Sequence, residues 1–290
     1  MNAYLVSHNG LGDNLFMIGA LRFLLTFYNN IYFLCKNKYY ANVKEFFENS
    51  NIHCIPFDEN NEYNEISYII KSNYDANDIL VCGPCHKSYL SSKITNPGLL
   101  HFKPIDKGYT IDYDTITSNM YNNLIENIYN DINLNLTYFY EYFYIPSTSI
   151  SLEYYNYIKD YYIIFVQTTT SDNKKLNISN LIGKYLYDEN TIIISNDENL
   201  YDIEIKSEEI EKKYHICNKI RSNSRVVYYN DIILNSNEIY IIDSCFTGIV
   251  LPYLKTNKLK TNKVRIIYRE IVNEIELYTP PNISNGTKTT

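Results

Sequence analysis

Short apolar runs alternate with longer segments of helical periodicity along the first half of the chain. Runs of this kind, bounded by polar or turn residues, predict strands that are buried on both faces. The predicted strands are Ala3–Ser7, Ile31–Cys35, Ile52–Phe57 and Ile79–Cys82. The predicted helices are Asp13–Tyr28, Tyr39–Glu48, Tyr63–Lys71 and, after a less regular stretch, Met120–Ile132. Strands and helices that alternate at this spacing predict βαβ units around a parallel sheet.

The alternation starts again after Pro146-Ser147-Thr148-Ser149, which we interpret as a linker. The strands predicted beyond it are Tyr161–Gln167, Thr191–Ser195, Val226–Tyr229, Glu238–Ile242 and Val264–Tyr268. The predicted helices are Ile178–Tyr187, Ser207–Ile220, Asp231–Asn235 and Thr247–Leu254. The pattern therefore predicts an α/β protein with two Rossmann-like domains that face each other across a cleft. The predicted domains are residues 1–146 and 147–278, followed by a flexible tail over residues 279–290.

The composition is that of a folded, acidic protein. The 290 residues are 45% hydrophobic and 20% charged, with a net charge of −7, so the chain can bury sizeable cores. The negative charge argues against nucleic-acid binding, which favours a basic surface. No apolar run reaches the length of about 18 residues that a membrane span needs, and the first residues lack the pattern of a secretory signal. We therefore expect no membrane span and a cytoplasmic location.

Residues with AT-rich codons are used heavily, including 32 Tyr in a chain with no Trp. This bias suggests an AT-rich genome, such as that of a large DNA virus, in which case the location would be the host cytoplasm. In a reducing compartment the 6 cysteines are expected to be free rather than bridged.

A glycine-containing turn follows the first predicted strand and opens the first predicted helix. Its sequence is Ser7-His8-Asn9-Gly10-Leu11-Gly12-Asp13-Asn14. The two glycines allow a tight turn and a close approach of a ligand to the backbone, and the N–H groups of the next helical turn can receive an anion. The alternative is that Asp13 only caps the helix, as aspartate often does.

A second strand–turn–helix junction lies near the C-terminus. Its sequence is Ile239-Tyr240-Ile241-Ile242-Asp243-Ser244-Cys245-Phe246-Thr247-Gly248. Ser244 can cap the helix, and the N–H groups from Cys245 to Gly248 can bind a phosphate. A purely structural junction would have a similar sequence.

Together the two junctions resemble glycosyltransferases of the GT-B fold, and most closely the heptosyltransferase-like family 9. The "GxGD" turn of that family is similar to Gly10-Leu11-Gly12-Asp13, and its "pAL" segment to Gly19-Ala20-Leu21. Its "DSG" motif is similar to Asp243-Ser244-Cys245, although Cys245 replaces the glycine and the histidine that follows in the family is missing. The resemblance covers roughly residues 4–27 and 161–255.

The resemblance implies a transfer of a sugar from a nucleotide-sugar donor to an acceptor hydroxyl, with inversion and without a metal or other cofactor. It implies that Asp13 is the catalytic base and that the donor phosphates lie at Ser244, Cys245, Phe246, Thr247 and Gly248, with Lys174 or Lys175. The nucleotide would contact Asn196, Asp197, Glu198 and Asp243. The turn residues His8, Asn9, Gly10, Gly12 and Asn14, together with His86, would lie on the acceptor side.

Other signals leave alternatives open. Cys82-Gly83-Pro84-Cys85 is the thioredoxin tetrapeptide, but the chain has no Trp and lacks the later proline of that fold. Asp112-Tyr113-Asp114 matches the DxD motif of metal-dependent GT-A enzymes, but we interpret it as a solvated turn. We interpret the Tyr138–Tyr144 run as part of the core rather than as an aromatic surface on which a sugar stacks. The alternative functions are a nucleotide-sugar 2-epimerase, a non-catalytic GT-B-like binding protein and a thiol oxidoreductase.

Overall fold

The computed structural model describes residues 2–7, 10–73, 79–82, 125, 126, 128, 129, 134–170, 173–204, 207–223 and 225–267. The chain forms two compact units. Unit 1 comprises Met1–Thr148, Arg225–Asn230 and Gly248–Lys258, and unit 2 comprises Ser149–Ser224, Asp231–Thr247 and Leu259–Thr290. The return of two short late segments to unit 1 is not evident from the sequence pattern.

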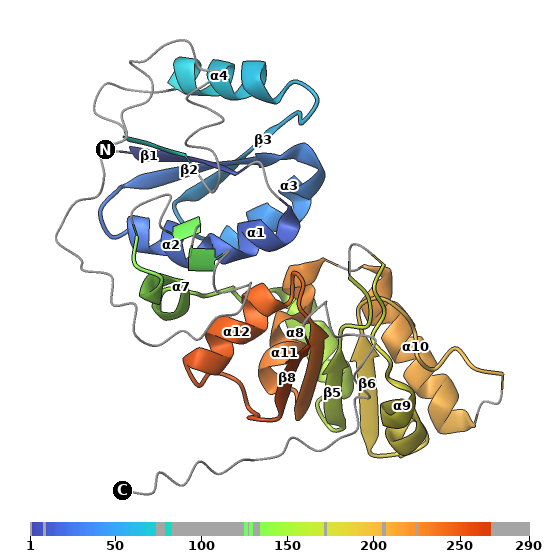
Figure 1. Ribbon diagram of the computed structural model, residues 1–290. Coiled ribbons are helices and arrows are strands. Elements are labelled where there is room, and N and C mark those ends of the chain that lie inside the picture. Colours follow the sequence, from blue (N-terminus) through green and yellow to red (C-terminus); the bar gives the residue numbers. More distant parts are fainter. Residues whose placement is uncertain are drawn as a thin grey trace, which may run out of the picture. The chain divides into compact units, whose positions relative to one another are not determined.

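Unit 1 is built on a parallel sheet of the strands β1 (Asn2–Ser7), β2 (Asn30–Lys36), β3 (Ile52–Phe57) and β4 (Ile79–Cys82). Its strand order is β3-β2-β1-β4. The helices α1 and α2 lie on one face of this sheet and α4 lies on the other (Figure 1). The helical segments are α1 (Leu11–Phe16), α2 (Ile18–Leu24), α3 (Asn37–Val43), the 3-10 helix η1 (Lys44–Phe47), α4 (Glu62–Asn73) and α7 (Thr137–Glu141).

Unit 2 repeats the arrangement with a second parallel sheet, in the order β6-β5-β7-β8. Its strands are β5 (Tyr162–Val166), β6 (Thr191–Ser195), β7 (Glu238–Ile242) and β8 (Val264–Ile267). The helices of this unit are α8 (Ser149–Ile158), α9 (Ser179–Tyr185), α10 (Glu208–Ser222) and all but the first residue of α11 (Asn230–Asn235), whereas α12 (Thr247–Lys255) belongs to unit 1 from Gly248 onward. The two parallel sheets confirm the predicted α/β class.

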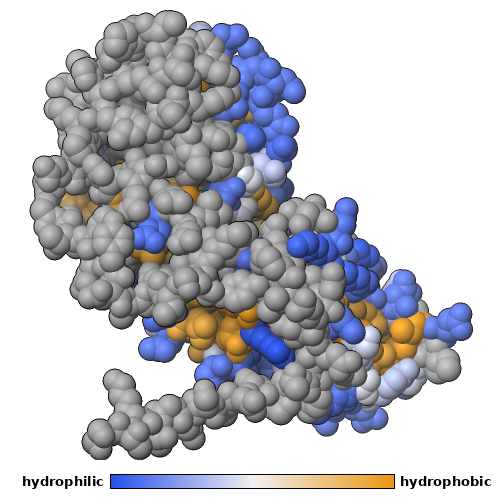
Figure 2. All heavy atoms as spheres, in the orientation of Figure 1, coloured by the Kyte–Doolittle hydropathy of each residue, from blue (hydrophilic) through white to orange (hydrophobic). Residues whose placement is uncertain are grey.

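Strands such as β1 and β6 form because their apolar residues are covered on both faces. All five residues of β6 are buried, as are the last five of β1, which is the pattern expected of a parallel sheet between helices. In Figure 2 the described surface is largely hydrophilic, with hydrophobic areas between the blue ones. The large apolar side chains exposed on the described part of the chain are Phe27, Tyr68, Tyr144, Leu152 and Tyr187.

The long helix predicted over Asp13–Tyr28 is wrong, because the structure breaks it at Met17 into α1 and α2. The buried hydroxyl of Tyr129 donates to the carbonyl of Phe16 and accepts from the N–H of Ala20, each at 3.0 Å. The Ala20 N–H and the Phe16 carbonyl are the pair that a continuous helix would join directly. A hydroxyl inserted into this ladder is a known cause of a helix break.

The strand predicted over Val226–Tyr229 is also wrong. These residues form the 3-10 helix η3, and all four are buried. The segment belongs to unit 1, where the N–H of Val226 donates to Oδ1 of Asn42 at 3.1 Å. Arg225 forms an ion pair with Glu45 in the same unit. A short buried apolar run does not reveal its secondary structure by periodicity alone.

Several helix limits also differ from the prediction. The predicted helix Tyr39–Glu48 is α3 followed by the 3-10 helix η1, and the sequence pattern gave no sign of α7 or α8. Of the predicted helix Met120–Ile132, residues 125, 126, 128 and 129 are described and are helical. The predicted tail, residues 279–290, lies outside the described residues.

The tyrosine-rich run Tyr138–Tyr144 packs largely into the core of unit 1, as predicted. Tyr138 stacks on Phe23 with ring centroids 3.8 Å apart, and Phe139 and Phe143 are buried. Gly19 of α2 makes this packing close, because a Cβ there would lie 2.4 Å from the carbonyl oxygen of Tyr138. No side chain fits in that space.

Gly19→Ala should therefore lower the free energy of unfolding by about 1–3 kcal/mol, because the clashing atoms are backbone and overpacking forces the backbone to move. The matched control is Gly183→Ala in α9, where a Cβ meets nothing within 4 Å. That change should raise stability by about 0.5–1 kcal/mol through helix propensity. Urea unfolding of both variants tests the pair, and an equal effect of the two substitutions would contradict the packing account.

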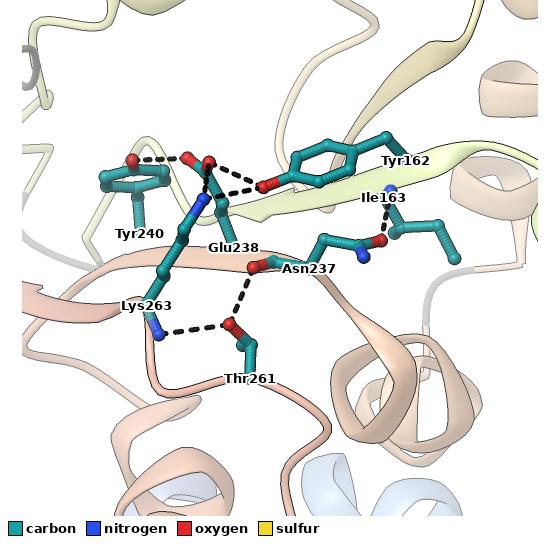
Figure 3. A network of polar contacts seen from close by, with 7 residues as sticks. All are labelled: Tyr162, Ile163, Asn237, Glu238, Tyr240, Thr261 and Lys263. Carbon is teal, nitrogen blue, oxygen red and sulfur yellow. Dashed lines mark hydrogen bonds and ion pairs between the residues drawn. The ribbon is translucent and has the colours of Figure 1, made fainter.

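A polar network joins the amino-terminal ends of β5, β7 and β8 in unit 2 (Figure 3). Glu238 is 5% exposed and accepts from the hydroxyls of Tyr162 at 2.8 Å and Tyr240 at 2.6 Å. Lys263 forms an ion pair with the same carboxylate at 3.2 Å. Burial alone would raise the pKa of Glu238, but these contacts outweigh it and lower the pKa below its usual 4.5.

Because the network favours the charged carboxylate, its stabilisation is present above the ordinary glutamate pKa and is lost as the pH falls through the lowered pKa of Glu238. Glu238→Gln should lower the free energy of unfolding by about 1–3 kcal/mol near pH 7, and the difference from wild type should shrink well below pH 4.5. Glu208→Gln, at an exposed glutamate of α10, is the control. A difference from wild type that does not change with pH would rule out this coupling.

Candidate functional site

The strand order of unit 2 selects one edge of its sheet as a binding position. β5 pairs with β6 on one side and with β7 on the other, so the chain passes from β5 to β6 on one side and then crosses over to β7 on the opposite side. In open parallel sheets ligands bind outside the carboxyl ends of the strands at such a reversal point. In this unit the residues that follow the two central strands are Gln167, after β5, and Asp243 and Ser244, after β7.

Gln167 connects the two strand ends directly. Its N–H donates to the carbonyl of Tyr240 at 2.9 Å. Its side-chain Nε2 donates to Oγ of Ser244 at 2.9 Å and to the carbonyl of Thr169 at 3.4 Å. Ser244 lies 77 positions further along the chain, so the parallel pairing of β5 and β7 is what brings these side chains together.

Asp197 fixes the loop that leaves β5. Its Oδ2 accepts from the N–H of Thr168 at 2.6 Å, from the N–H of Thr169 at 2.5 Å and from the Thr168 hydroxyl at 2.8 Å. Burial raises the pKa of Asp197, against the opposing effect of these three bonds, and the neighbouring Glu198 raises it further. The aspartate that the resemblance assigns to the nucleotide is therefore also a structural clamp on the first loop of the site.

The two candidate lysines lie on a hairpin that follows this loop. The N–H of Leu176 donates to the carbonyl of Thr168 at 2.7 Å, and the N–H of Thr170 donates to the carbonyl of Lys174 at 3.0 Å. Lys175 is exposed and forms an ion pair with Glu198 at 3.1 Å. The structure thus brings the expected phosphate-binding and nucleotide-binding segments side by side.

The turn between β7 and α12 is closed by its own hydrogen bonds. The N–H of Thr247 donates to the carbonyl of Ser244 at 3.0 Å, and the N–H of Ser244 donates to Oγ1 of Thr247 at 3.3 Å. Cys245 is half-buried, and burial raises the pKa of its thiol to about 11. The Phe246 ring packs edge-on against Phe165 in the core of unit 2. The turn therefore carries three buried polar side chains, those of Asp243, Ser244 and Thr247.

Gly248 has a packing reason to be glycine. A Cβ at this position would lie 2.9 Å from Cβ of Leu15 and 3.2 Å from Cε1 of Phe16, both in α1. Gly248 belongs to unit 1, as α1 does. The absence of a side chain at Gly248 allows α12 to pack closely on α1. The sequence could not reveal this packing role, because the contact with α1 joins residues far apart in the chain.

The glycine turn of unit 1 is capped by Asp13. Oδ2 of Asp13 accepts from the N–H of Gly10 at 2.8 Å, and Nδ2 of the buried Asn14 donates to the carbonyl of Gly10 at 2.7 Å. Gly10 has φ −74° and ψ 175°, an extended conformation that any residue adopts, and Gly12 lies within α1. The backbone conformation at Gly10 therefore does not require glycine, and the capping contact of Asp13 is present.

Several predicted features lie outside the described residues: His8, Asn9, His86, the pair Asp112 and Asp114, and Gly83 to Cys85 of the thioredoxin-like tetrapeptide. Cys82 ends β4, which pairs with β1. Among the described residues, no group of three or more His, Cys, Asp or Glu side chains is placed to hold a metal ion. No described helix has both the length and the apolar composition that a membrane span needs.

No protein-family model matches the sequence, and neither does any curated protein. Among solved structures, the chain is similar to the Escherichia coli ADP-heptose LPS heptosyltransferase II, with a TM-score of 0.56 and 12% identity over 95% of both chains. It is also similar to a family 9 glycosyltransferase from Veillonella parvula DSM 2008, with a TM-score of 0.54 and 12% identity over 97% of this chain and 90% of the other. These likenesses confirm the expected fold, that of the family 9 glycosyltransferases.

The clamp on the first loop of the site can be tested by hydrogen exchange. Asp197→Ala leaves the N–H groups of Thr168 and Thr169 without their acceptor, so we expect their exchange to become at least about tenfold faster, with a loss of about 1–3 kcal/mol in stability. Glu198→Ala is the matched control, because Glu198 pairs with the exposed Lys175 and does not hold these N–H groups. Equal protection of both amides in the two variants would show that Asp197 does not clamp the loop.

Proposed function

We propose that the protein is a glycosyltransferase that moves a sugar from a nucleotide-sugar donor to an acceptor hydroxyl, with inversion and without a metal cofactor. The observation that carries this proposal is the polar edge at the reversal point of unit 2, where Gln167, Asp197 and Ser244 hold three strand ends together. The fold shared with the solved glycosyltransferases supports the same reaction class.

In this proposal the donor diphosphate binds at the turn from Ser244 to Thr247, where α12 begins. The N–H groups at the start of a helix and the helix dipole favour an anion. Lys174 and Lys175, on the neighbouring hairpin, add positive charge for the leaving diphosphate. The nucleoside lies toward the segment from Asn196 to Glu198. The name of the Escherichia coli neighbour, an ADP-heptose heptosyltransferase, is consistent with a nucleotide-sugar donor.

Asp13 is the proposed catalytic base on the acceptor side. Its carboxylate takes the proton of the acceptor hydroxyl as that oxygen attacks the anomeric carbon of the donor sugar. The bond from the anomeric carbon to the diphosphate oxygen breaks, and its electron pair leaves with the diphosphate. A single displacement of this kind inverts the configuration at the anomeric carbon. His8, Asn9 and His86 are proposed to contact the acceptor.

The donor is found by measuring thermal stabilisation of the wild-type protein by UDP-, GDP-, ADP-, CMP- and dTDP-ligands, because a ligand of the native state raises the melting temperature. With that donor, Asp13→Asn should lower kcat by on the order of 10²-fold or more. The asparagine can still accept from the N–H of Gly10, so the melting temperature and the donor affinity should stay close to wild type.

Asp13→Ala is the companion variant, because it removes the capping acceptor as well as the base. It should lose the same turnover and, in addition, about 1 kcal/mol of stability. Full turnover in Asp13→Asn would limit the residue to the capping contact. Donor binding without turnover in the wild-type protein would favour a non-catalytic binding protein.

A further inference from the structure

One buried side chain at the proposed donor site has an unused hydrogen-bond acceptor. Gln167 is 2% exposed, and its Oε1 has no hydrogen-bond partner in the structure. The orientation of the amide follows from its neighbours, because the carbonyl of Thr169 can only accept and therefore faces Nε2. Oε1 is the other end of the amide, so it points away from the Ser244 hydroxyl and the Thr169 carbonyl, which both contact Nε2.

A buried acceptor without a partner costs about 1–3 kcal/mol, so such atoms in folded proteins usually face a ligand or an ordered water. Asn196 repeats the pattern one strand away, after β6, where its Oδ1 is also buried without a partner. Both atoms are acceptors, so the partner that suits this edge carries donor groups. A phosphate oxygen would be repelled, whereas a hydroxyl would be bound.

We propose that Oε1 of Gln167 accepts a hydrogen bond from a hydroxyl next to the diphosphate of the bound nucleotide sugar, which makes Gln167 a specificity-determining residue. The inference rests on the proposed function. The 2.9 Å bond from Nε2 to Ser244 places the amide beside the turn that would hold the diphosphate. The two groups that flank a diphosphate in a nucleotide sugar are the ribose and the transferred sugar, and both carry hydroxyls.

The test is calorimetric binding of ADP, UDP and GDP, their 2′-deoxy and 3′-deoxy counterparts, and the corresponding nucleotide glucoses to wild type and to Gln167→Met. If the hydroxyl belongs to the ribose, wild type should prefer one ribonucleotide over a deoxy form by about tenfold, and the variant should lose that preference. If it belongs to the transferred sugar, the variant should instead lose the gain in affinity from nucleoside diphosphate to nucleotide glucose.

Two further variants separate this role from a structural one. Gln167→Glu keeps an acceptor oxygen, so it should keep the hydroxyl preference even though its charge weakens diphosphate binding overall. Ser244→Ala removes the partner of Nε2 but leaves Oε1, so it should weaken ribo and deoxy ligands alike.

Unchanged preferences in Gln167→Met, with wild-type affinity for each ligand, would show that a water is the partner of Oε1 and would overturn the inference. An equal loss of affinity for all ligands in that variant would show that Gln167 only positions Ser244. If neither these nucleotides nor any other ligand of the stabilisation screen binds the wild-type protein, the proposed function fails, and the inference fails with it.

Discussion

The parallel pairing of β5 with both β6 and β7 determines where unit 2 can bind a ligand. Three separate loops reach the same sheet edge only because these strands run in the same direction side by side. Gln167 and Ser244 meet across this edge, and Asp197 meets Thr168. None of these contacts is local in sequence, so each depends on the pairing of the strands.

The two ends of the sheet have different polar chemistry. At the amino-terminal ends of β5, β7 and β8 the carboxylate of Glu238 is fully used by two tyrosine hydroxyls and Lys263 (Figure 3). At the carboxyl-terminal ends the clamps leave buried acceptors unused, on Gln167 and Asn196. A network in which the carboxylate has all its hydrogen-bond partners stabilises the fold, whereas buried acceptors without a partner on a rigid sheet edge are available to a ligand. Groups held in place before binding also cost no reorganisation during a reaction, which favours catalysis.

The sequence predicted the sheets better than the site. Four strands, including Thr191–Ser195 and Glu238–Ile242, have the predicted limits. These two are buried along almost their whole length, which makes their apolar runs easy to recognise. The break at Met17 could not be predicted, since the hydroxyl of Tyr129 causes it from more than a hundred positions away. Val226–Tyr229 was misassigned because burial, rather than sheet pairing, explains its apolar run. For the site, the polar Gln167-Thr168-Thr169 directly after a strand was a usable signal, but the clamp by Asp197 was not visible in the sequence.

The central claim is that a nucleotide-sugar donor binds at the β5–β7 edge of unit 2. Hydrogen exchange of the wild-type protein, with and without the nucleoside diphosphate that stabilises it most, tests this claim most directly. The account predicts added protection in two segments, from Val166 to Thr170 and from Asp243 to Gly248, with little change at the amino-terminal ends of the same strands. Protection confined to other parts of the chain, or none with a ligand that binds, would contradict it.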